Sequence, residues 1–233
     1  MDANFIINEL QSVGTPAKAA HLQKYFKTGP GQYGEGDVFI GVVVPHTRSI
    51  AKANIKTPLT EIRILLKSKY HEARLCALLI LTERFKKAVE KERKEIFDFY
   101  LKNTSCINNW DLVDLSCTTI VGMYLLNKDR KILYELADSK CLWEQRIAVV
   151  STYAFIREYE FYDILELSKK LLTHKHDLMH KAVGWMLREV GKRSRRTLTD
   201  FLEEYATKLP RTSLRYAIEH YPEPERLYFL KKK

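Results

Sequence analysis

The chain has 233 residues, of which 45% are apolar and 29% are charged, and its formal net charge is +10 with an isoelectric point near 9.3. This length is enough for one large domain with a buried core, and no uncharged apolar run approaches the roughly 18 residues that a bilayer-spanning helix needs. The acidic start, MDANFIINELQ, lacks the basic segment of a secretory signal, so we expect a cytoplasmic protein with no membrane partner. Taken alone, the positive charge favours a polyanionic partner, such as nucleic acid or an acidic membrane surface.

Helical periodicity dominates the chain, because apolar residues recur at three- and four-residue spacing almost throughout. The exception is TGPGQYGEGDVFIGVVVP at 28–45, which is rich in glycine and then holds the only strand-like run. Gly29, Gly31 and Gly34 formally match G-x-G-x-x-G, but no strand precedes them and Pro30 interrupts them. We therefore expect 28–45 to be an ordered loop and not a phosphate cradle.

The stretch NNWDLVD at 108–114 predicts the start of a helix that runs from 110 to 125. Asn108 or Asn109 is the expected cap, and Asp111 is an ordinary acid of a first turn. Capping does not explain Asp114, which lies one turn further on and on the same side as Trp110. The residues expected to face the core are Leu112, Val113, Ser116, Ile120 and Met123.

The next helices repeat this arrangement of a tryptophan and a charge turned away from an apolar stripe. Trp143 and Arg146 form one such pair. In the helix predicted over 177–192, Trp185 lies about 130° from the centre of the apolar stripe, between Lys181 and Arg188. This placement invites a ligand, although packing of Trp185 against an adjacent helix explains it equally well. The apolar stripe consists of Ala182, Val183, Met186, Leu187 and Val190.

The run GKRSRR at 191–196 continues that helix toward a predicted junction between two helices. A charge run by itself is often only a solvated face. Here it extends a helix that already carries cations and an aromatic ring, which is what a groove needs to neutralise phosphates and to contact sugars or bases. The cations of the run are Lys192, Arg193, Arg195 and Arg196.

Charged residues also recur at a repeat-like spacing of 40, 32, 35 and 34 residues, at Arg74, Asp114, Arg146, Lys181 and Arg215. This period is typical of paired-helix solenoids of the HEAT or armadillo kind. We therefore predict an all-α repeat solenoid in which 1–233 form a single domain. Because core positions are seldom charged, we expect this charged row on an exposed face, the concave one used for binding.

Metal and disulfide chemistry have little support in the sequence. The cysteines are widely separated and lack a C-x-x-C pair, so we expect them to be reduced core residues. They are Cys76, Cys106, Cys117 and Cys141. His176 and His180 stand one helical turn apart, but no H-E-x-x-H pattern or carboxylate set accompanies them. We predict no metal and no cofactor.

In these motifs the chain resembles the AlkD-like DNA alkylation-repair glycosylases, which are built from HEAT-like repeats. The resemblance rests on WDLVD at 110–114, LWEQR at 142–146 and KAVGWMLRE at 181–189, in that order, and extends to the N-terminal KAAHLQKYFK. It implies hydrolysis of the N-glycosidic bond of positively charged purines, such as 3-methyladenine and 7-methylguanine, in duplex DNA without base flipping. It also implies a monomer that is associated with the nucleoid through DNA.

The resemblance assigns roles to individual residues. Asp114 matches the catalytic aspartate, which stabilises an oxocarbenium-like sugar and positions water. Trp110 and Trp185 match two aromatic residues that cradle the deoxyribose. Tyr25 matches a position near the lesion, and Arg146 matches an arginine that contacts the backbone. The expected phosphate contacts are Lys181, Arg188, Lys192, Arg193, Arg195 and Arg196.

One departure from the family pattern is visible, and two alternatives stay open. The family stretch often reads W-W-D-x-V-D, whereas the first tryptophan is here Asn109, which we expect to serve structure more than substrate. Some relatives bind unusual DNA structures without excising bases. Many helical solenoids are instead scaffolds for protein partners. No lysine is clearly placed to form a Schiff base, so β-elimination is not expected.

Overall fold

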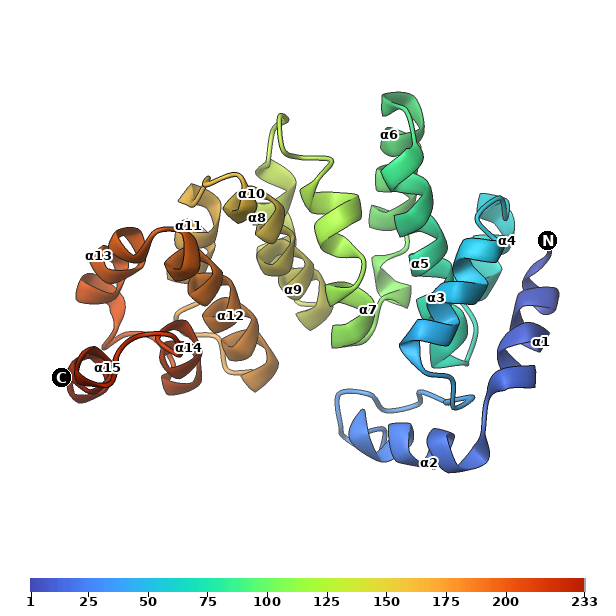
Figure 1. The fold of residues 1–233 in the computed structure, drawn as a ribbon, viewed down its shortest axis with the longest axis horizontal. Coiled ribbons are helices and arrows are strands. Elements are labelled where there is room, and N and C mark those ends of the chain that lie inside the picture. The colour runs from blue at the N-terminus through green and yellow to red at the C-terminus, as the bar shows by residue number, and fades with distance from the viewer. Residues whose placement is uncertain (233) are drawn as a thin grey trace. The chain divides into compact units, whose positions relative to one another are not determined.

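The computed structural model describes residues 1–232, which are all-α apart from one isolated parallel bridge between Val38 and Tyr70 (Figure 1). This confirms the predicted fold class of an α-helical repeat solenoid. The chain divides into two compact units, Met1–Ser116 and Cys117–Lys233. The expectation that 1–233 form a single domain stays a prediction. Within the described residues, no helix is long and apolar enough to cross a bilayer.

The first unit is built around α5. Its elements are α1 (Ala3–Val13), α2 (Pro16–Tyr25), α3 (Val44–Ala53), α4 (Leu59–Leu66), α5 (His71–Lys87), α6 (Glu90–Leu101), a 3-10 turn (Thr104–Cys106) and α7 (Trp110–Asp114). Helix α5 packs against α1, α3, α4, α6 and α7. Because it is surrounded, 14 of its 17 residues are buried, including the polar residues of its first turn. Those polar side chains therefore need partners inside the protein.

Helix α2 and the Gly-rich loop (28–45) lie at one end of α1, α3 and α5 (Figure 1). Thr15 caps α2 by accepting a hydrogen bond from the N–H of Lys18, and Pro16 occupies the first turn. The loop then passes close to the start of α2 at Gly41, which has φ +94°, and a Cβ there would lie 2.2 Å from the carbonyl oxygen of Thr15. Glycine is therefore required at this position.

The second unit is centred on α12. Its elements are a π-helical turn (Thr118–Gly122), α8 (Lys131–Ala137), α9 (Leu142–Ser151), α10 (Tyr153–Arg157), α11 (Tyr162–Lys170), α12 (Asp177–Arg193), α13 (Arg195–Tyr205), α14 (Arg211–Ala217) and α15 (Glu223–Lys231). Helix α12 packs against α9, α10, α11, α13 and α14. The whole predicted apolar stripe of α12 is buried, so the predicted orientation of this helix is confirmed.

The single helix predicted over 110–125 is wrong, because α7 ends at Asp114 and only the π-helical turn follows. The hydroxyl of Ser116 bonds to the carbonyl oxygens of Leu112 and Val113, which competes with continuation of the helix. Met123, predicted to be buried, is 40% exposed.

The expectation of an exposed charged row is also wrong for two of its members. Arg74 and Arg146 are only 6% and 5% exposed. Each guanidinium finds polar partners inside its own unit: Arg74 reaches Asp37, and Arg146 donates to the carbonyl oxygen of Leu178 at 2.6 Å. Trp143, expected to turn away from the core, is buried at 9% exposure.

Candidate functional site

Helix α7 carries two aspartates in different environments. Asn109 caps the helix by accepting a hydrogen bond from the N–H of Trp110, which settles the choice between Asn108 and Asn109. Trp110 and Asp114 are both partly exposed and, four residues apart, lie on the same side of the helix. Asp111 is only 5% exposed. One carboxylate of α7 thus faces the interior, while the other reaches solvent.

The indole of Trp110 belongs to a cluster of aromatic side chains, which we call the aromatic group (Tyr25, Phe26, Tyr33 and Trp110). Phe26 stacks on Trp110 with ring centroids 5.2 Å apart and an interplanar angle of 17°. Tyr25, at the end of α2 and 58% exposed, meets Trp110 edge-on at 6.2 Å. The indole N–H also donates to the hydroxyl of Tyr33 at 3.3 Å. The structure therefore brings together the predicted site residues Tyr25 and Trp110.

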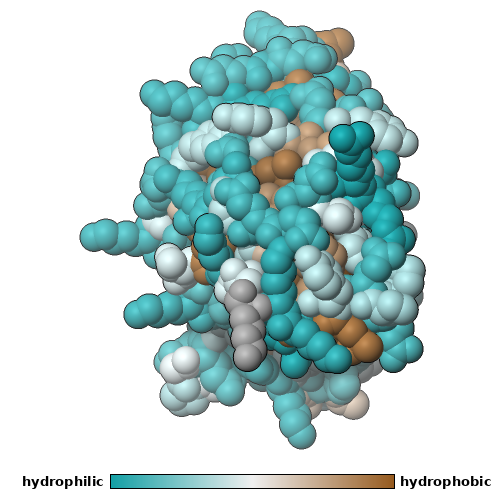
Figure 2. Space-filling model, turned by 90° about the vertical axis from the view of Figure 1, so that its left-hand side faces the viewer, coloured by the Kyte–Doolittle hydropathy of each residue, from teal (hydrophilic) through white to brown (hydrophobic). Residues whose placement is uncertain are grey.

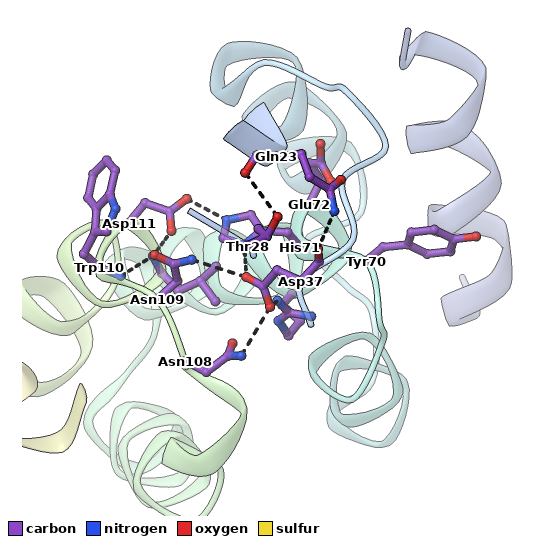
Figure 3. Close-up of polar contacts among 12 residues, drawn as sticks. Gln23, Thr28, Asp37, Tyr70, His71, Glu72, Asn108, Asn109, Trp110 and Asp111 are labelled. Carbon is purple, nitrogen blue, oxygen red and sulfur yellow. Dashed lines mark hydrogen bonds and ion pairs between the residues drawn. The ribbon is translucent and has the colours of Figure 1, made fainter. Parts of the chain in front are cut away.

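Next to the aromatic group, a buried histidine bridges two aspartates, and we call these three residues the histidine clasp (Asp37, His71 and Asp111). His71 Nδ1 lies 2.9 Å from Asp37 Oδ2, and its Nε2 lies 2.8 Å from Asp111 Oδ2 (Figure 3). The imidazole is 2% exposed and stacks on Phe39 at 4.5 Å, and Phe26 lies 5.0 Å from it. Only a doubly protonated imidazole donates to both carboxylates.

The charges of the histidine clasp shift the pKa values of its members. Burial by itself lowers the pKa of His71, but the hydrogen bonds to Asp111 and Asp37 outweigh it and raise the pKa from 6.5 to about 9. Burial raises the pKa of Asp37, and its contacts with His71 and Arg74 more than reverse this, so the pKa falls below the usual value of 3.8. His71 is therefore a cation and Asp37 an anion at neutral pH.

Further contacts tie the Gly-rich loop to α5 and α7. Asp37 accepts hydrogen bonds from Arg74 at 2.5 Å and from the side-chain amides of Asn108 and Asn109, each at 3.3 Å. Asn109 is fully buried, so the position that departs from the family pattern serves structure, as expected.

The carboxylate of Glu72 also holds the loop. It accepts hydrogen bonds from three consecutive backbone N–H groups, those of Ile40, Gly41 and Val42. The first turn of α5 thus contributes three buried charged residues, His71, Glu72 and Arg74, to anchoring the loop. Sequence reasoning missed this network, although the charged start HEAR, placed directly before the apolar run LCALLIL, was a signal.

The Gly-rich loop behaves as an ordered loop. The N–H groups of Gly29, Gly31 and Gly34 donate to Gln32, Glu35 and the backbone carbonyl oxygen of Lys27, respectively. A Cβ at Gly34 would lie 2.5 Å from the carbonyl oxygen of Phe26, so this glycine permits a close turn. With these donors already bonded, the segment does not form a phosphate cradle.

In the second unit, α12 carries Trp185 at a partly exposed position. Its indole lies near Tyr153 of α10, with ring centroids 6.4 Å apart. The buried Arg146 of α9 bonds to Leu178 in the first turn of α12. Arg146 therefore supports the helix that bears Trp185.

The predicted phosphate contacts form the basic strip (Lys181, Arg188, Lys192, Arg193, Arg195 and Arg196), in which each cation lies beside an acid. Lys192 and Arg193 share Glu189, whereas the other pairs are Lys181–Asp177, Arg188–Glu219, Arg195–Glu225 and Arg196–Asp200. The end of the second unit that bears α13 and α15 is mostly hydrophilic, with small apolar patches (Figure 2). The pairs of Lys181, Arg195 and Arg196 are exposed and contribute little to stability, so these three cations can exchange an acid for a phosphate at small cost. The run 191–196 spans the junction of α12 and α13, as predicted.

No cluster of three or more potential metal ligands occurs among residues 1–232. His176 Nδ1 accepts the N–H of Leu178, and His180 Nε2 bonds to the carbonyl oxygen of His174, so both side chains have local partners. The cysteines are unbridged, and Cys76 and Cys117 are buried, whereas Cys106 and Cys141 are partly exposed.

Comparison with known proteins agrees with this architecture. A sequence profile of the family described as DNA alkylation repair enzyme matches residues 6–221. Among solved structures, the chain is similar to a predicted DNA alkylation repair enzyme from Enterococcus faecalis, with a TM-score of 0.71, 17% identity and coverage of 90% of this chain and 97% of that one. At this identity the likeness shows the fold alone, and no curated protein matches the chain. Because the family profile covers nearly its whole length, the chain belongs to the DNA alkylation repair enzyme family.

Proposed function

We propose that this protein is a monofunctional DNA glycosylase that hydrolyses the N-glycosidic bond of cationic N3- and N7-alkylated purines in duplex DNA. The observation that carries the proposal is the different burial of the two aspartates of α7. Asp111 is buried in the histidine clasp, whereas Asp114 is partly exposed on the side of the helix that carries Trp110. A carboxylate beside an accessible indole suits the stabilisation of a positively charged sugar.

The barrier to cleavage of the glycosidic bond is already lowered, because the alkylated base carries a positive charge and is a good leaving group. The bond between C1′ and the base nitrogen breaks, the base leaves as a neutral molecule with the electron pair, and positive charge develops on the sugar. Asp114 stabilises this charge and orients a water molecule, whose oxygen bonds to C1′ while its proton passes to the carboxylate or to solvent. The products are the free base and an abasic site in an intact strand.

The aromatic residues and the basic strip have supporting roles in this proposal. Trp110 and Tyr25 contact the lesion nucleotide, and the 58% exposure of Tyr25 suits contact at the surface of the DNA without base flipping. In the second unit, the partly exposed indole of Trp185 is proposed to contact the DNA, and the basic strip contacts phosphates. Because Arg146 is buried, we assign it the support of the first turn of α12.

The proposal is tested with duplex DNA that contains 7-methylguanine. The wild-type chain should release free base and leave an abasic site, without the strand cleavage or borohydride-trapped adduct that a Schiff base would give. Asp114→Asn should slow release by about 100-fold or more, because one charge that stabilises the transition state is lost, while DNA affinity changes little. Asp138→Asn, which alters an exposed aspartate paired with Lys170, is the matched control and should act like wild type.

Other outcomes would overturn the proposal. Binding without base release would indicate a non-catalytic DNA-binding relative on the same scaffold. No binding at low salt, where phosphate contacts are strongest, would indicate a scaffold for protein partners. Undiminished release by Asp114→Asn would remove this residue from the mechanism.

A further inference from the structure

We infer that His71 is a positioning residue for the proposed reaction: by bonding to Asp37 and Asp111 at once, it joins the Gly-rich loop to α7 and fixes the aromatic group. This inference rests on the proposed function for its catalytic consequence. The joining of the loop to α7 is a separate physical claim that can be tested without any turnover.

The histidine clasp joins three segments that are distant in sequence. Asp37 lies in the Gly-rich loop, His71 opens α5, and Asp111 stands in α7 beside Trp110. Their side chains are 2% to 7% exposed, so water does not compete for these hydrogen bonds. A link of this kind holds its partners in one geometry as long as both hydrogen bonds persist.

The clasp acts on Trp110 from two directions. Through Asp111 it holds the helix from which Trp110 and Asp114 project. Through Asp37 it holds the loop whose Tyr33 bonds to the indole N–H of Trp110. Phe26 lies between the two sides, 5.2 Å from the ring of Trp110 and 5.0 Å from that of His71. Loss of the clasp should therefore displace the indole and, on the same short helix, Asp114.

The imidazole keeps both hydrogen bonds only while it is charged. The imidazolium donates from both nitrogens, whereas a neutral imidazole donates from one and presents a lone pair to the other carboxylate. Because the pKa of His71 is raised from 6.5 to about 9, the stabilisation is fully present below about pH 6.5 and is lost as the pH rises through about 9. The lowered pKa of Asp37 works in the opposite sense, since its contribution is lost only as the pH falls below about 4.

Other charged groups near His71 come from each element packed against it. Asp37 lies in the Gly-rich loop and Asp111 in α7, while α5 itself adds Glu72 and Arg74. Lys18 of α2 shares with His71, Glu72 and Asp111 the lining of a cavity of about 270 Å³.

The kinetic test compares wild type with His71→Gln in single-turnover release of 7-methylguanine between pH 6 and 9.5, with enzyme-free DNA as the baseline. Glutamine is neutral and does not reproduce both bonds. At pH 7 the variant should release base about tenfold more slowly, while its dissociation constant for DNA stays within about threefold of wild type. The wild-type rate should fall as the pH rises, with a midpoint near pH 9, and the variant should lack this decrease, which we call the basic limb of the pH profile. His46→Gln, which replaces an exposed histidine of α3, is the matched control and should show the same basic limb as wild type.

Two further measurements keep the inference separable from the proposed function. An NMR titration of the His71 imidazole should give a pKa of about 9. The fluorescence of Trp110, taken as the difference from a Trp110→Phe variant, should change with the same midpoint in wild type and not in His71→Gln. If wild type releases no base, the proposed function fails, and these two titrations still decide whether the clasp exists.

If His71→Gln does not fold, Asp111→Asn replaces it, because this change leaves the contacts of Asp37 with His71 and Arg74 in place. With one carboxylate fewer, the basic limb should move to lower pH by about one unit. A folded variant with an unchanged rate and an unchanged basic limb would overturn the inference, as would a His71 pKa below 7 in wild type.

Discussion

Two aspartates three residues apart on α7 have opposite environments, and their partners decide which is which. Asp111 meets His71, which lies 40 positions earlier in the chain, whereas Asp114 stays partly exposed. Local spacing made Asp114 the exceptional residue and Asp111 an ordinary acid of a helix start. The second interpretation was incomplete, because the partner of Asp111 is set by tertiary packing that no local pattern contains.

Trp143 and Trp185 were both expected to turn away from the core, but the structure buries Trp143 and leaves Trp185 partly exposed. Trp143 is 9% exposed, so Trp143→Ala should leave a cavity and reduce the free energy of unfolding by about 3–5 kcal/mol. Trp185 is partly exposed, so Trp185→Ala should reduce the free energy of unfolding by less than about 1.5 kcal/mol. It should nevertheless slow base release by about tenfold or more.

Urea unfolding and single-turnover release, measured on both tryptophan variants, check this contrast. A loss of stability in Trp185→Ala as large as that in Trp143→Ala would mean that Trp185 is a packing residue, the alternative that its sequence pattern left open.

At the scale of elements, the Gly-rich loop offers a matched pair of glycines, both with positive φ. At Gly41, with φ +94°, a Cβ would also lie 2.2 Å from a backbone oxygen, whereas at Gly31, with φ +72°, nothing lies within 4 Å. Gly31→Ala should therefore reduce the free energy of unfolding by about 1 kcal/mol, because of its backbone conformation alone. Gly41→Ala should reduce it by about 3 kcal/mol or more, because the backbone itself must move.

Chemical denaturation of the two glycine variants measures this difference. Equal losses would show that the loop does not pack against the start of α2 as described.

The sequence predicted a helix that buries a single apolar stripe, such as α12. It did not predict where a helix is interrupted or where a helix is buried on all sides. The apolar period of α12 predicted its start at Asp177 and its end to within one residue, because the stripe continues along the whole helix. The same reasoning failed over 110–125, where Ser116 bonds back to two carbonyl oxygens. Nor could periodicity reveal that the first turn of α5 is buried, since its partners come from the Gly-rich loop.

At the scale of the whole molecule, the net charge of +10 predicted a polyanionic partner, and the family is one of DNA repair. What the total charge could not show is that the cations of the basic strip sit beside acids. Arg74 and Arg146, counted by sequence among the exposed charges, are buried. Composition therefore indicated the class of partner, while the identity of the contacting residues depends on burial.

The corresponding prediction concerns the dependence of DNA binding on salt. Arg196, whose side chain is 93% exposed, should contribute about one unit to the slope of log K against log salt, so Arg196→Ala should reduce that slope by about one for damaged and undamaged DNA alike. Lys131→Ala serves as the control, because Lys131 is 78% exposed but lies outside the basic strip. Fluorescence anisotropy between about 50 and 200 mM salt measures both slopes, and equal slopes for wild type and Arg196→Ala would exclude a phosphate contact at this position.

The carboxylate of Glu72 has a consequence for how a non-helical segment is accommodated in a helical unit. Backbone N–H groups that lie inside a protein but outside a helix or sheet need other partners, because a buried donor without a hydrogen bond costs free energy. Here a single side chain satisfies the donors of Ile40, Gly41 and Val42, and one bridge satisfies Val38. The loop therefore packs against the buried start of α5 without a neighbouring strand and without unbonded donors at these positions.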